Sequence, residues 1–316
     1  MKTGGAPRIL SPVLLADYST FRLGGVCPRL ITCSCARELN EAVSELADAK
    51  ESFVLMGGGS NLLISDAGLP GTVLRYATEK LEVRESGHEQ FTVDGSAFLD
   101  DMASWSVRNG LDGLVCCSGI PGTVAGAVVG NAGAWGKQIG DALCRVTLMD
   151  RNGKTRSVGP DELKFSYRSS ALKQSSDVVV DVTLNLRIGR AGELGRERKR
   201  ILKTRSEKHP DLERDPCIGS IFRNIEPTSA ARRRQAAGWF LEEAGVKEMT
   251  VGGARVFDRH ANIIVGGPGC SAQNVRDLAE LMKEAVLEKF GIELIREVRY
   301  LGAFEREPSR RWNDVS

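Results

Sequence analysis

The chain has 316 residues, 41% of them hydrophobic, with 43 basic and 41 acidic residues and a net charge of +2. This length and apolar content support two or three domains with separate cores, and the balanced charge argues against a nucleic-acid partner. No stretch approaches the roughly 18 consecutive apolar residues of a membrane span, and the N-terminus lacks the apolar core of a signal peptide, so we expect a cytoplasmic protein with no membrane span.

The first segment of the chain alternates strands with one helix. Apolar runs predict strands at 29–33, 52–56 and 72–74. Apolar side chains at helical spacing predict a helix over 36–49. We therefore expect residues 17–75 to form a small α+β lobe.

The second segment, residues 76–208, is richer in strands. Its β-branched and alternating runs predict strands at 81–83, 91–93, 146–149 and 178–186. Helices are predicted at 98–108 and 192–206, and we expect the stretch of charged side chains at 196–203 to be a solvated helix face. Prolines at 210 and 216 then disfavour helical backbone, which places a domain boundary near residue 208.

The third segment, residues 209–302, is again a mixture of helices and strands. Helices are predicted near 229–244 and 271–289, and strands near 251–257, 262–265 and 292–301. Residues 303–316 are polar, and we expect them to be a tail outside the domain.

The first glycine-rich loop, Gly57-Gly58-Gly59-Ser60-Asn61-Leu62, directly follows a predicted strand. Glycine lets backbone approach a ligand closely and adopts positive φ without steric cost. The amides of such a loop, together with the Ser60 hydroxyl and the Asn61 side chain, form an anion-binding nest suited to a diphosphate. The spacing matches neither the Rossmann nor the P-loop pattern. Taken alone, the loop is equally consistent with an ordinary glycine turn.

The second glycine-rich loop, Gly119-Ile120-Pro121-Gly122-Thr123, leads into a run of small residues that includes Gly126. Pro121-Gly122 predicts a turn, and Thr123 is placed to cap a short helix whose N-terminus would face a phosphate. Another close-approach segment follows, containing Asn131 and Gly133. Two such loops indicate a dinucleotide held between them.

These loops resemble those of the vanillyl-alcohol-oxidase-like family of FAD-binding domains, in which Gly-Gly-Gly-Ser/Thr-Asn follows a strand. The second loop, with Asn131 to Gly136, is similar to that of the UDP-N-acetylenolpyruvoylglucosamine reductase family (UDP-N-acetylmuramate dehydrogenases), shorter type. Further motifs of that family follow in order: Phe165-Ser166-Tyr167-Arg168-Ser169-Ser170, Gly219-Ser220-Ile221-Phe222-Arg223-Asn224 and Glu293-Leu294-Ile295-Arg296-Glu297-Val298. The resemblance covers about residues 17–302.

The resemblance implies an α+β protein with a two-lobed FAD-binding domain of the vanillyl-alcohol-oxidase/PCMH type and a C-terminal α+β substrate-binding domain. It implies non-covalent FAD, NADPH as co-substrate, and reduction of the enolpyruvyl double bond of UDP-N-acetylglucosamine enolpyruvate to UDP-N-acetylmuramate in peptidoglycan precursor synthesis. No histidine or cysteine stands in either loop to bind flavin covalently. The oligomeric state does not follow from the sequence.

The resemblance places three sets of functional residues on the chain. The residues expected at the cofactor are Gly57, Gly58, Gly59, Ser60, Asn61, Leu62, Gly119, Ile120, Pro121, Gly122, Thr123, Gly126, Asn131 and Gly133. The residues expected at the UDP-sugar substrate are Tyr167, Arg223, Asn224 and Asn262. The catalytic set is Arg168, Ser220 and Glu297.

The three catalytic residues suit a conjugate hydride addition, in which negative charge builds on the substrate and a carbon is protonated. An arginine stays charged and binds a carboxylate through two hydrogen bonds, so Arg168 suits stabilisation of that charge. Ser220 takes the family's proton-donor position. Glu297 either binds the substrate in its protonated form, which requires a raised pKa, or orients Arg168 or a water.

The chain departs from the family pattern at a few positions. Arg223 stands where a lysine is common, Ile225 where a proline is common, and the stretch around Arg232 to Arg234 is unusually basic. The role of that stretch does not follow from the sequence.

The eight cysteines and three histidines show no metal-ligand spacing, so we expect reduced thiols and no metal. A cysteine acting at the active site stays open at this stage. Two other functions also stay open: an FAD-dependent oxidase of a hydroxy acid or sugar on the same fold, and a flavin-binding interaction module without activity. An assay separates them, because only the reductase needs NADPH and an enolpyruvyl acceptor.

Overall fold

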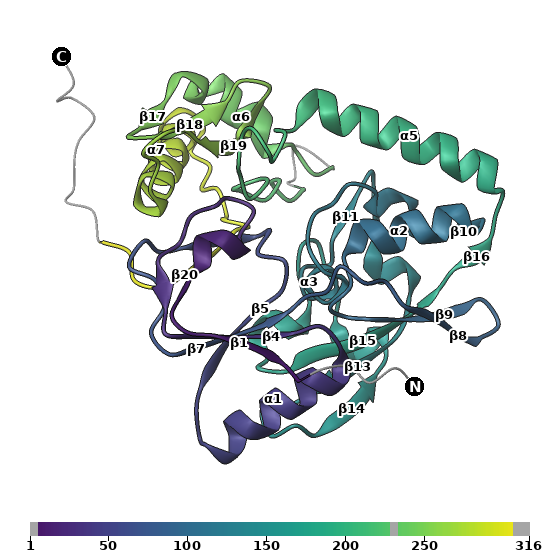
Figure 1. Cartoon of the computed structure of the whole chain (residues 1–316). Coiled ribbons are helices and arrows are strands. Elements are labelled where there is room, and N and C mark those ends of the chain that lie inside the picture. The colour runs from purple at the N-terminus through teal and green to yellow at the C-terminus, as the bar shows by residue number, and fades with distance from the viewer. Residues whose placement is uncertain (1–5, 228–232, 306–316) are drawn as a thin grey trace. The chain divides into compact units, whose positions relative to one another are not determined.

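The computed structural model describes residues 6–227 and 233–305 (Figure 1). The chain divides into two compact units: the first combines the described parts of Met1–Val13, Cys27–Ser60 and Gly71–Lys208, and the second combines those of Leu14–Val26, Asn61–Pro70 and His209–Ser316. This division differs from the three consecutive segments expected. Residues 17–75 and 76–208 fall largely into one unit, while 17–26 and 61–70 join the C-terminal one.

The first unit contains a mostly parallel four-stranded sheet of order β1-β4-β7-β5. Its strands are β1 (Arg8–Leu10), β4 (Arg29–Cys33), β5 (Phe53–Met56) and β7 (Thr72–Tyr76). The helix predicted at 36–49 is α1 (Ala36–Asp48), which buries Leu39, Val43 and Leu46 in a core shared with the sheet. The apolar residues recur at helical spacing, and their burial accounts for the helix at this place.

The first unit also contains an antiparallel five-stranded sheet of order β14-β13-β15-β9-β8. Its strands are β8 (Val83–Gly87), β9 (Gln90–Asp94), β13 (Leu143–Met149), β14 (Thr155–Val158) and β15 (Val178–Asn185). The prediction of a strand at 81–83 was wrong in position, because β8 continues through four exposed residues after Val83. Pairing with β9, rather than an apolar pattern of its own, keeps that edge strand extended.

Helices and short elements complete the first unit. The helices are α2 (Leu99–Arg108), α3 (Val124–Gly130), α4 (Pro160–Leu163) and α5 (Ala191–Lys208), with 3₁₀ turns η2 (Val115–Cys117), η3 (Ile139–Ala142) and η4 (Ala171–Gln174). The short strands are β10 (Leu111–Asp112), β11 (Gly133–Ala134), β12 (Lys137–Gln138) and β16 (Arg187–Ile188). One core cluster joins α2 and α3 to the inner face of the five-stranded sheet.

The second unit packs helices on a three-stranded antiparallel sheet of order β17-β18-β19. Its elements are η1 (Leu15–Tyr18), β6 (Leu62–Ile64), α6 (Ala237–Glu243), η5 (Val246–Glu248), β17 (Thr250–Val251), β18 (Ala254–Phe257), β19 (His260–Gly266), α7 (Ala272–Phe290) and β20 (Arg299–Leu301). Two further short strands, β2 (Val13–Leu14) and β3 (Val26–Cys27), pair with each other. Figure 1 shows α7 beside the labelled strands of this sheet.

Two segments remote in sequence join the second unit because they share its core. Phe21, which is 1% exposed, and Leu63, which is fully buried, belong to the same apolar cluster as Ile263 and Leu278. β6 also pairs in parallel with β20, so the residues just after the first glycine loop belong to the C-terminal unit. The helix expected at 229–244 is shorter, since α6 begins at Ala237; residues 228–232, including Arg232, lie outside the described residues. None of the described helices is both long and apolar enough for a membrane crossing.

Candidate cofactor and active site

The two glycine loops lie against each other within the first unit. Ser60 Oγ donates a hydrogen bond to the carbonyl of Pro121 at 3.1 Å. A Cβ on Gly57 would lie 2.6 Å from Thr123 Oγ1, and a Cβ on Gly122 would lie 2.5 Å from Ser60 Oγ. Such distances are shorter than any normal contact, so glycine at these positions is what lets the loops approach each other. The juxtaposition expected of the two loops is therefore present.

Several backbone amides of the two glycine loops lack a hydrogen-bond acceptor in the described part of the chain. Among the described residues, none accepts a hydrogen bond from the N–H of Gly58, Gly59, Ser60 or Gly122. Gly59 is buried, and Gly59 and Gly122 have φ of +68° and +112°. Unpaired backbone N–H groups in a recessed loop need water or a ligand oxygen. Clustered N–H groups of this kind form a nest for anions, which suits the diphosphate of a dinucleotide.

The helix expected after the second loop is confirmed. Thr123 Oγ1 accepts a hydrogen bond from the N–H of Gly126 at 3.2 Å, capping α3 as predicted. The cap places a buried threonine beside the first loop, because the same Oγ1 limits the space at Gly57. The cap and the close approach of the loops are thus a single packing arrangement.

Asn131 and Gly133 have evident structural tasks. Asn131 ends α3 in the left-handed conformation, with φ +46°, and its side chain is fully buried. Its Nδ2 donates to the carbonyl of Ser166 at 2.9 Å, and its Oδ1 accepts from the N–H of Gly140 at 3.2 Å. Gly133 lies where a Cβ would come within 2.1 Å of the Lys137 carbonyl. The Asn131 side chain therefore braces the turn that carries Arg168, and contact of either residue with a cofactor stays a prediction.

Arg168 lies at the tip of a tight turn in the first unit. Ser166 and Ser169 exchange backbone hydrogen bonds of 3.0 and 3.1 Å across this turn, leaving Tyr167 and Arg168 at its tip. Arg168 has φ +54°, a conformation that non-glycine residues rarely adopt and that costs about 1–3 kcal/mol. Its guanidinium lies 5.3 Å from the centre of the Tyr167 ring. Strain at a positively charged residue that its surroundings hold in place is a common property of functional sites.

The second unit brings Ser220 and Glu297 onto neighbouring segments. The N–H of Glu297 donates to the Ile221 carbonyl at 2.8 Å, and the N–H of Arg223 donates to the Ile295 carbonyl at 2.8 Å. On the other side, Ser220 forms a bridge with Ile263 of β19. The Ser220 hydroxyl makes no hydrogen bond with another described residue, and Gly219 before it has φ +76°. The hydroxyl is thus available to a ligand.

Asn262 and Asn224 hold the Ser220 segment in place. Asn262 is 2% exposed, and its side-chain amide both accepts from the N–H of Phe222 at 3.0 Å and donates to the carbonyl of Phe222 at 2.8 Å. Asn224 Oδ1 accepts from the N–H of Ala237, the first residue of α6, at 3.1 Å. We expected both asparagines at the substrate. The structure gives their side chains positioning tasks, and substrate contact stays a prediction.

The remaining expected residues divide between the units. Asn61 Nδ2 lies 3.5 Å from the carbonyl of Glu297, and Leu62 begins the strand paired with β20, so both belong to the second unit. Arg223 has a buried Nε without a partner among the described residues, as expected of a side chain that awaits an anion. Tyr167 shares the turn of Arg168.

Arg205 of α5 is a candidate site residue that sequence reasoning missed. Its Cδ lies 2.9 Å from where a Cβ of Gly119 would be, and its guanidinium lies 5.3 Å from the centre of the Trp135 ring. Its Nε is buried, and no described residue forms a hydrogen bond or an ion pair with it. Burial lowers the pKa of Arg205, and the charge of Arg168 acts in the same direction. The charge of Asp100 acts in the opposite direction. Arg205 is half-buried, and its buried Nε has no hydrogen-bond partner among the described residues, so it is a candidate for binding an anion.

The sequence carried a signal for Arg205. The expectation that residues 196–203 form a solvated face of α5 was wrong for Arg198, and Arg205 lies on the same face of the helix. Both are spaced at helical intervals from Leu194 and Ile201, the buried residues of that helix. Arg198 binds both carboxylate oxygens of Asp100, at 2.6 and 2.9 Å, and the same carboxylate accepts from the N–H of Gly119 at 2.6 Å. One face of α5 thus supports the second glycine loop with two arginines, one of which is paired.

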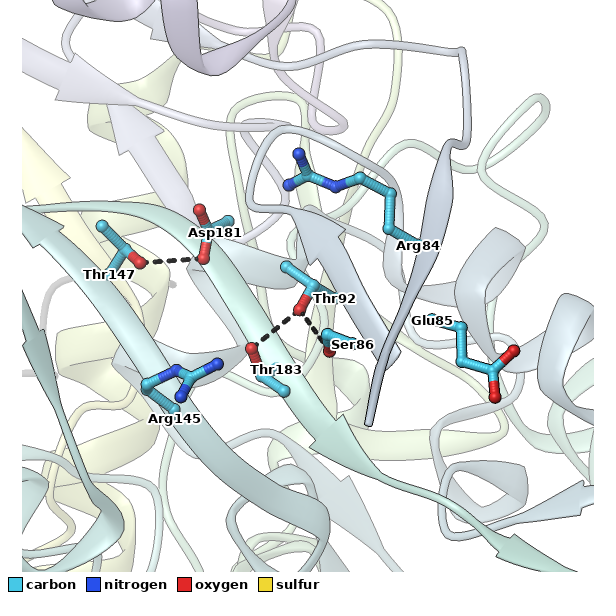
Figure 2. A pocket seen from close by; sticks show the side chains of 8 residues that line it. All are labelled: Arg84, Glu85, Ser86, Thr92, Arg145, Thr147, Asp181 and Thr183. Carbon is cyan, nitrogen blue, oxygen red and sulfur yellow. Dashed lines mark hydrogen bonds between the residues drawn. The ribbon is translucent and has the colours of Figure 1, made fainter. Parts of the chain in front are cut away.

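A concavity of about 380 Å³ on the outer face of the five-stranded sheet differs from the glycine loops in its hydrogen bonding (Figure 2). Thr92 Oγ1 lies 2.8 Å from Thr183 Oγ1 and 2.9 Å from Ser86 Oγ, and Thr147 donates to Asp181 at 2.9 Å. The hydroxyl side chains of the concavity and Asp181 therefore bond one another. Elsewhere too, the described part of the chain has no cluster of three His, Cys, Asp or Glu side chains that could hold a metal ion.

Comparisons with known proteins match two family models to the chain. A family model described as an FAD binding domain matches residues 28–159, and one described as the C-terminal domain of UDP-N-acetylenolpyruvoylglucosamine reductase matches residues 210–301. A protein of Solibacter usitatus named UDP-N-acetylenolpyruvoylglucosamine reductase is 34% identical over 96% of this chain and 100% of its own. One of Bacillus anthracis, named UDP-N-acetylenolpyruvoylglucosamine reductase 1, is 34% identical over 93% of this chain and 95% of its own.

A solved structure is similar over nearly the whole chain. The crystal structure of UDP-N-acetylenolpyruvylglucosamine reductase from Thermus caldophilus superposes with a TM-score of 0.76 and 29% identity. The match covers 94% of this chain and 100% of that one. The likeness therefore extends through both units.

Proposed function

The chain belongs to the UDP-N-acetylenolpyruvoylglucosamine reductase family, and we propose that it reduces the enolpyruvyl double bond of UDP-N-acetylglucosamine enolpyruvate, forming UDP-N-acetylmuramate. NADPH is the electron source and FAD the cofactor, in keeping with that family and with the FAD-binding domain. The observation that carries the proposal is the pair of glycine loops, which approach each other closely and include several backbone amides that have no partner among the described residues. The alternative of a hydroxy-acid or sugar oxidase finds no support among these relatives.

The residues of the first unit fit FAD. The amides of Gly58, Gly59, Ser60 and Gly122 match the oxygens of its diphosphate, and the guanidinium of Arg205 matches an anionic part of the same cofactor. When bound, FAD supplies a hydride acceptor for NADPH and a hydride donor for the substrate. Histidine and cysteine are absent from both loops, in keeping with non-covalent binding.

Arg168 stabilises the negative charge that develops on the substrate. Hydride addition to C3 of the enolpyruvyl group moves charge onto C2 and its carboxylate. A guanidinium fixed in advance stabilises such charge without reorganisation, and its two parallel N–H groups match a carboxylate. The strained turn and the Asn131 side chain below it fix the backbone of Arg168 in advance.

Ser220 is proposed to deliver the proton to C2. Its hydroxyl is available, and its backbone is held between β19 and the segment of Glu297. Glu297 is proposed to support that step, either as a protonated hydrogen-bond donor to the substrate or by orienting a water. The Asn262 amide fixes the strand that carries Ser220, and it is therefore a positioning residue for the transfer.

The test of this function is product analysis. The purified protein, NADPH and the enolpyruvyl UDP-sugar are incubated without oxygen, and the product is examined by mass spectrometry. We expect NADPH consumption equal to the amount of a product heavier by two hydrogens. Oxygen-dependent turnover of a hydroxy acid or sugar, with no change in the enolpyruvyl substrate, would instead establish the oxidase.

Ser220→Ala tests the role of the hydroxyl by separating the two half-reactions. The substitution removes one oxygen from a side chain that no described residue binds, so FAD binding and flavin bleaching by NADPH should persist. Reoxidation by the enolpyruvyl substrate should slow by about 100-fold or more, the scale of a lost general acid. Stopped-flow absorbance measures both steps.

Ser220→Cys is the matched variant for the same experiment. A thiol is a better acid than a hydroxyl, so part of the reoxidation rate should return. If Ser220→Ala instead slows bleaching by NADPH and leaves reoxidation intact, Ser220 is not the proton donor, and Glu297 becomes the first candidate.

A further inference from the structure

Two adjacent cysteines lie directly before the second glycine loop. Cys116 and Cys117 end the 3₁₀ turn η2, and their sulfur atoms are 3.8 Å apart. Both are buried, with exposed fractions of 3% and 0%. The proposed function gives this pair no task.

The backbone of the pair is bonded directly into the loop. The carbonyl of Cys117 accepts a hydrogen bond from the N–H of Ile120 at 3.1 Å, and the N–H of Cys117 donates to Leu114 at 2.8 Å. Ser118 lies between Cys117 and the loop, and its buried hydroxyl forms no hydrogen bond with a described residue. A movement of the Cys117 peptide therefore acts on Ile120 and on the Gly119–Thr123 segment that follows.

The two thiols differ in proton affinity. The hydrogen bond from Cys117 lowers the pKa of the Cys116 thiol, and the charge of Lys137 adds to this against burial and Asp141. For Cys117, the hydrogen bond to Cys116 and burial raise the pKa. Cys116 is thus the more acidic of the two thiols. A thiolate is the nucleophile in thiol oxidation, and a thiol in contact with it can resolve the product.

We propose that Cys116 and Cys117 are a modification site at which hydrogen peroxide closes a disulfide, and that this closure loosens the second glycine loop and weakens FAD binding. The second clause rests on the proposed cofactor site. The Cys116 thiolate attacks one peroxide oxygen, the O–O bond breaks, and water leaves after protonation, which gives a sulfenic acid. The Cys117 sulfur then attacks that sulfur and expels a second water. Two thiols lose two electrons and two protons to one peroxide.

Closure changes the loop because the sulfurs must move. A disulfide holds its sulfurs about 2.0 Å apart, so they must approach each other by roughly 1.8 Å. The two residues share one peptide bond, and most of that movement must come from rotation about the Cys116 and Cys117 backbone. The hydrogen bond from Ile120 to the Cys117 carbonyl is the nearest link to be disturbed. Burial limits the reaction to small oxidants and slows it.

The experiment uses the FAD-loaded protein treated with hydrogen peroxide, followed by alkylation of free thiols and tryptic digestion. The peptide of residues 109–137 holds Cys116 and Cys117 and no other cysteine. We expect this peptide to lose two hydrogens in mass and to escape alkylation, with reversal by dithiothreitol. In parallel, the Kd for FAD, measured by flavin fluorescence, should rise about tenfold, or about 1.4 kcal/mol.

Cys117→Ser should abolish the mass loss and the change in Kd, whereas Cys144→Ser, at a half-buried cysteine in β13, should retain both. A peptide that stays fully alkylated, or that gains oxygen without losing hydrogens, would overturn the proposed disulfide even if Cys117→Ser folds poorly. A disulfide with an unchanged Kd for FAD would overturn the coupling to the loop. Failure of the untreated protein to bind FAD would count against the proposed function, and the peptide mass would still decide the disulfide.

Discussion

Two polar regions of the first unit differ in hydrogen bonding. The concavity on the five-stranded sheet is lined by hydroxyls, an aspartate and arginines, and its buried hydroxyls bond one another (Figure 2). At the glycine loops, by contrast, the amides of Gly58, Gly59 and Ser60 and the Nε of Arg205 have no partner among the described residues. Among the described residues, the buried hydroxyls of the concavity have hydrogen-bond partners, whereas these amides and this Nε do not.

This difference identifies the ligand site more clearly than the size of a cavity does. A buried polar group without a partner costs about 1–3 kcal/mol, so it persists where a ligand completes it. Where each buried hydroxyl already has a hydrogen-bond partner, a bound ligand would add few hydrogen bonds. The comparison therefore predicts that substitutions at the loops change FAD affinity, while substitutions in the concavity change stability alone.

The largest effect is expected for Gly58→Val. A Cβ at this position would lie 3.2 Å from both Gly122 Cα and Phe98 Cε1, and the branches of valine would push the two loops apart. FAD affinity should fall more than about 100-fold, or about 2.8 kcal/mol, and the protein should be purified without colour. Gly159→Val is the matched control, because a Cβ there meets open space. Normal flavin content in Gly58→Val would remove this loop from the site.

An intermediate effect is expected for Arg205→Met. The substitution keeps the apolar stem that packs near Gly119 and removes the charge. A hydrogen bond to a charged group contributes about 1.5–3 kcal/mol, so FAD affinity should fall at least about tenfold. The Tm of the FAD-free protein should stay nearly equal, since no described residue forms an ion pair with Arg205.

Arg198→Met on the same helix face is the control for Arg205→Met. Arg198 is paired with Asp100, so its loss should lower the Tm of the FAD-free protein. Thermal denaturation with and without FAD measures both quantities. If Arg205→Met lowers the Tm and leaves the affinity for FAD unchanged, Arg205 is a structural residue.

The smallest effect on FAD is expected for Thr183→Val in the concavity. The side chain is 2% exposed, and the change deletes the hydroxyl that contacts Thr92 while Thr92 keeps Ser86. The free energy of unfolding should fall by about 1 kcal/mol, with FAD affinity unchanged within about twofold. Isothermal titration and urea denaturation give the two values. A marked loss of FAD affinity would show that the concavity is part of the FAD site and would contradict the distinction between the two regions.

Local patterns predicted much of the fold. The helix at 36–49, the strand at 29–33 and the cap at Thr123 were confirmed, because each depends on neighbours within one or two turns. The edge strand β8 was misplaced, since its residues have no apolar alternation and only pairing with β9 keeps them extended.

Pairing between strands far apart in the sequence determines which unit a segment joins, and local patterns do not predict such pairing. Asn61 and Leu62 follow Ser60 directly, yet they belong to the second unit because β6 pairs with β20. Nothing local to residues 61–64 signals a strand partner near residue 300. Division of a chain into units depends on such contacts, and these place residues 17–26 and 61–70 in the C-terminal unit.

The candidate site shows the same limit. Motifs located the glycine loops and the turn of Arg168, whereas the tasks of the asparagines depend on distant partners. Asn262 bonds Phe222, and Asn131 bonds Ser166, across gaps that no local pattern predicts. Arg205 was hidden among the charges of α5, although its spacing from Leu194 and Ile201 placed it on the buried face.

The most direct test of the central claim is the anaerobic absorbance spectrum of the purified protein. It should show the bands of oxidised flavin, and NADPH should bleach them. Addition of UDP-N-acetylglucosamine enolpyruvate should restore the bands in the absence of oxygen, and denaturation followed by filtration should release the colour from the chain. A protein without flavin, or a bleached flavin that the enolpyruvyl substrate leaves reduced while oxygen restores it, would contradict the account.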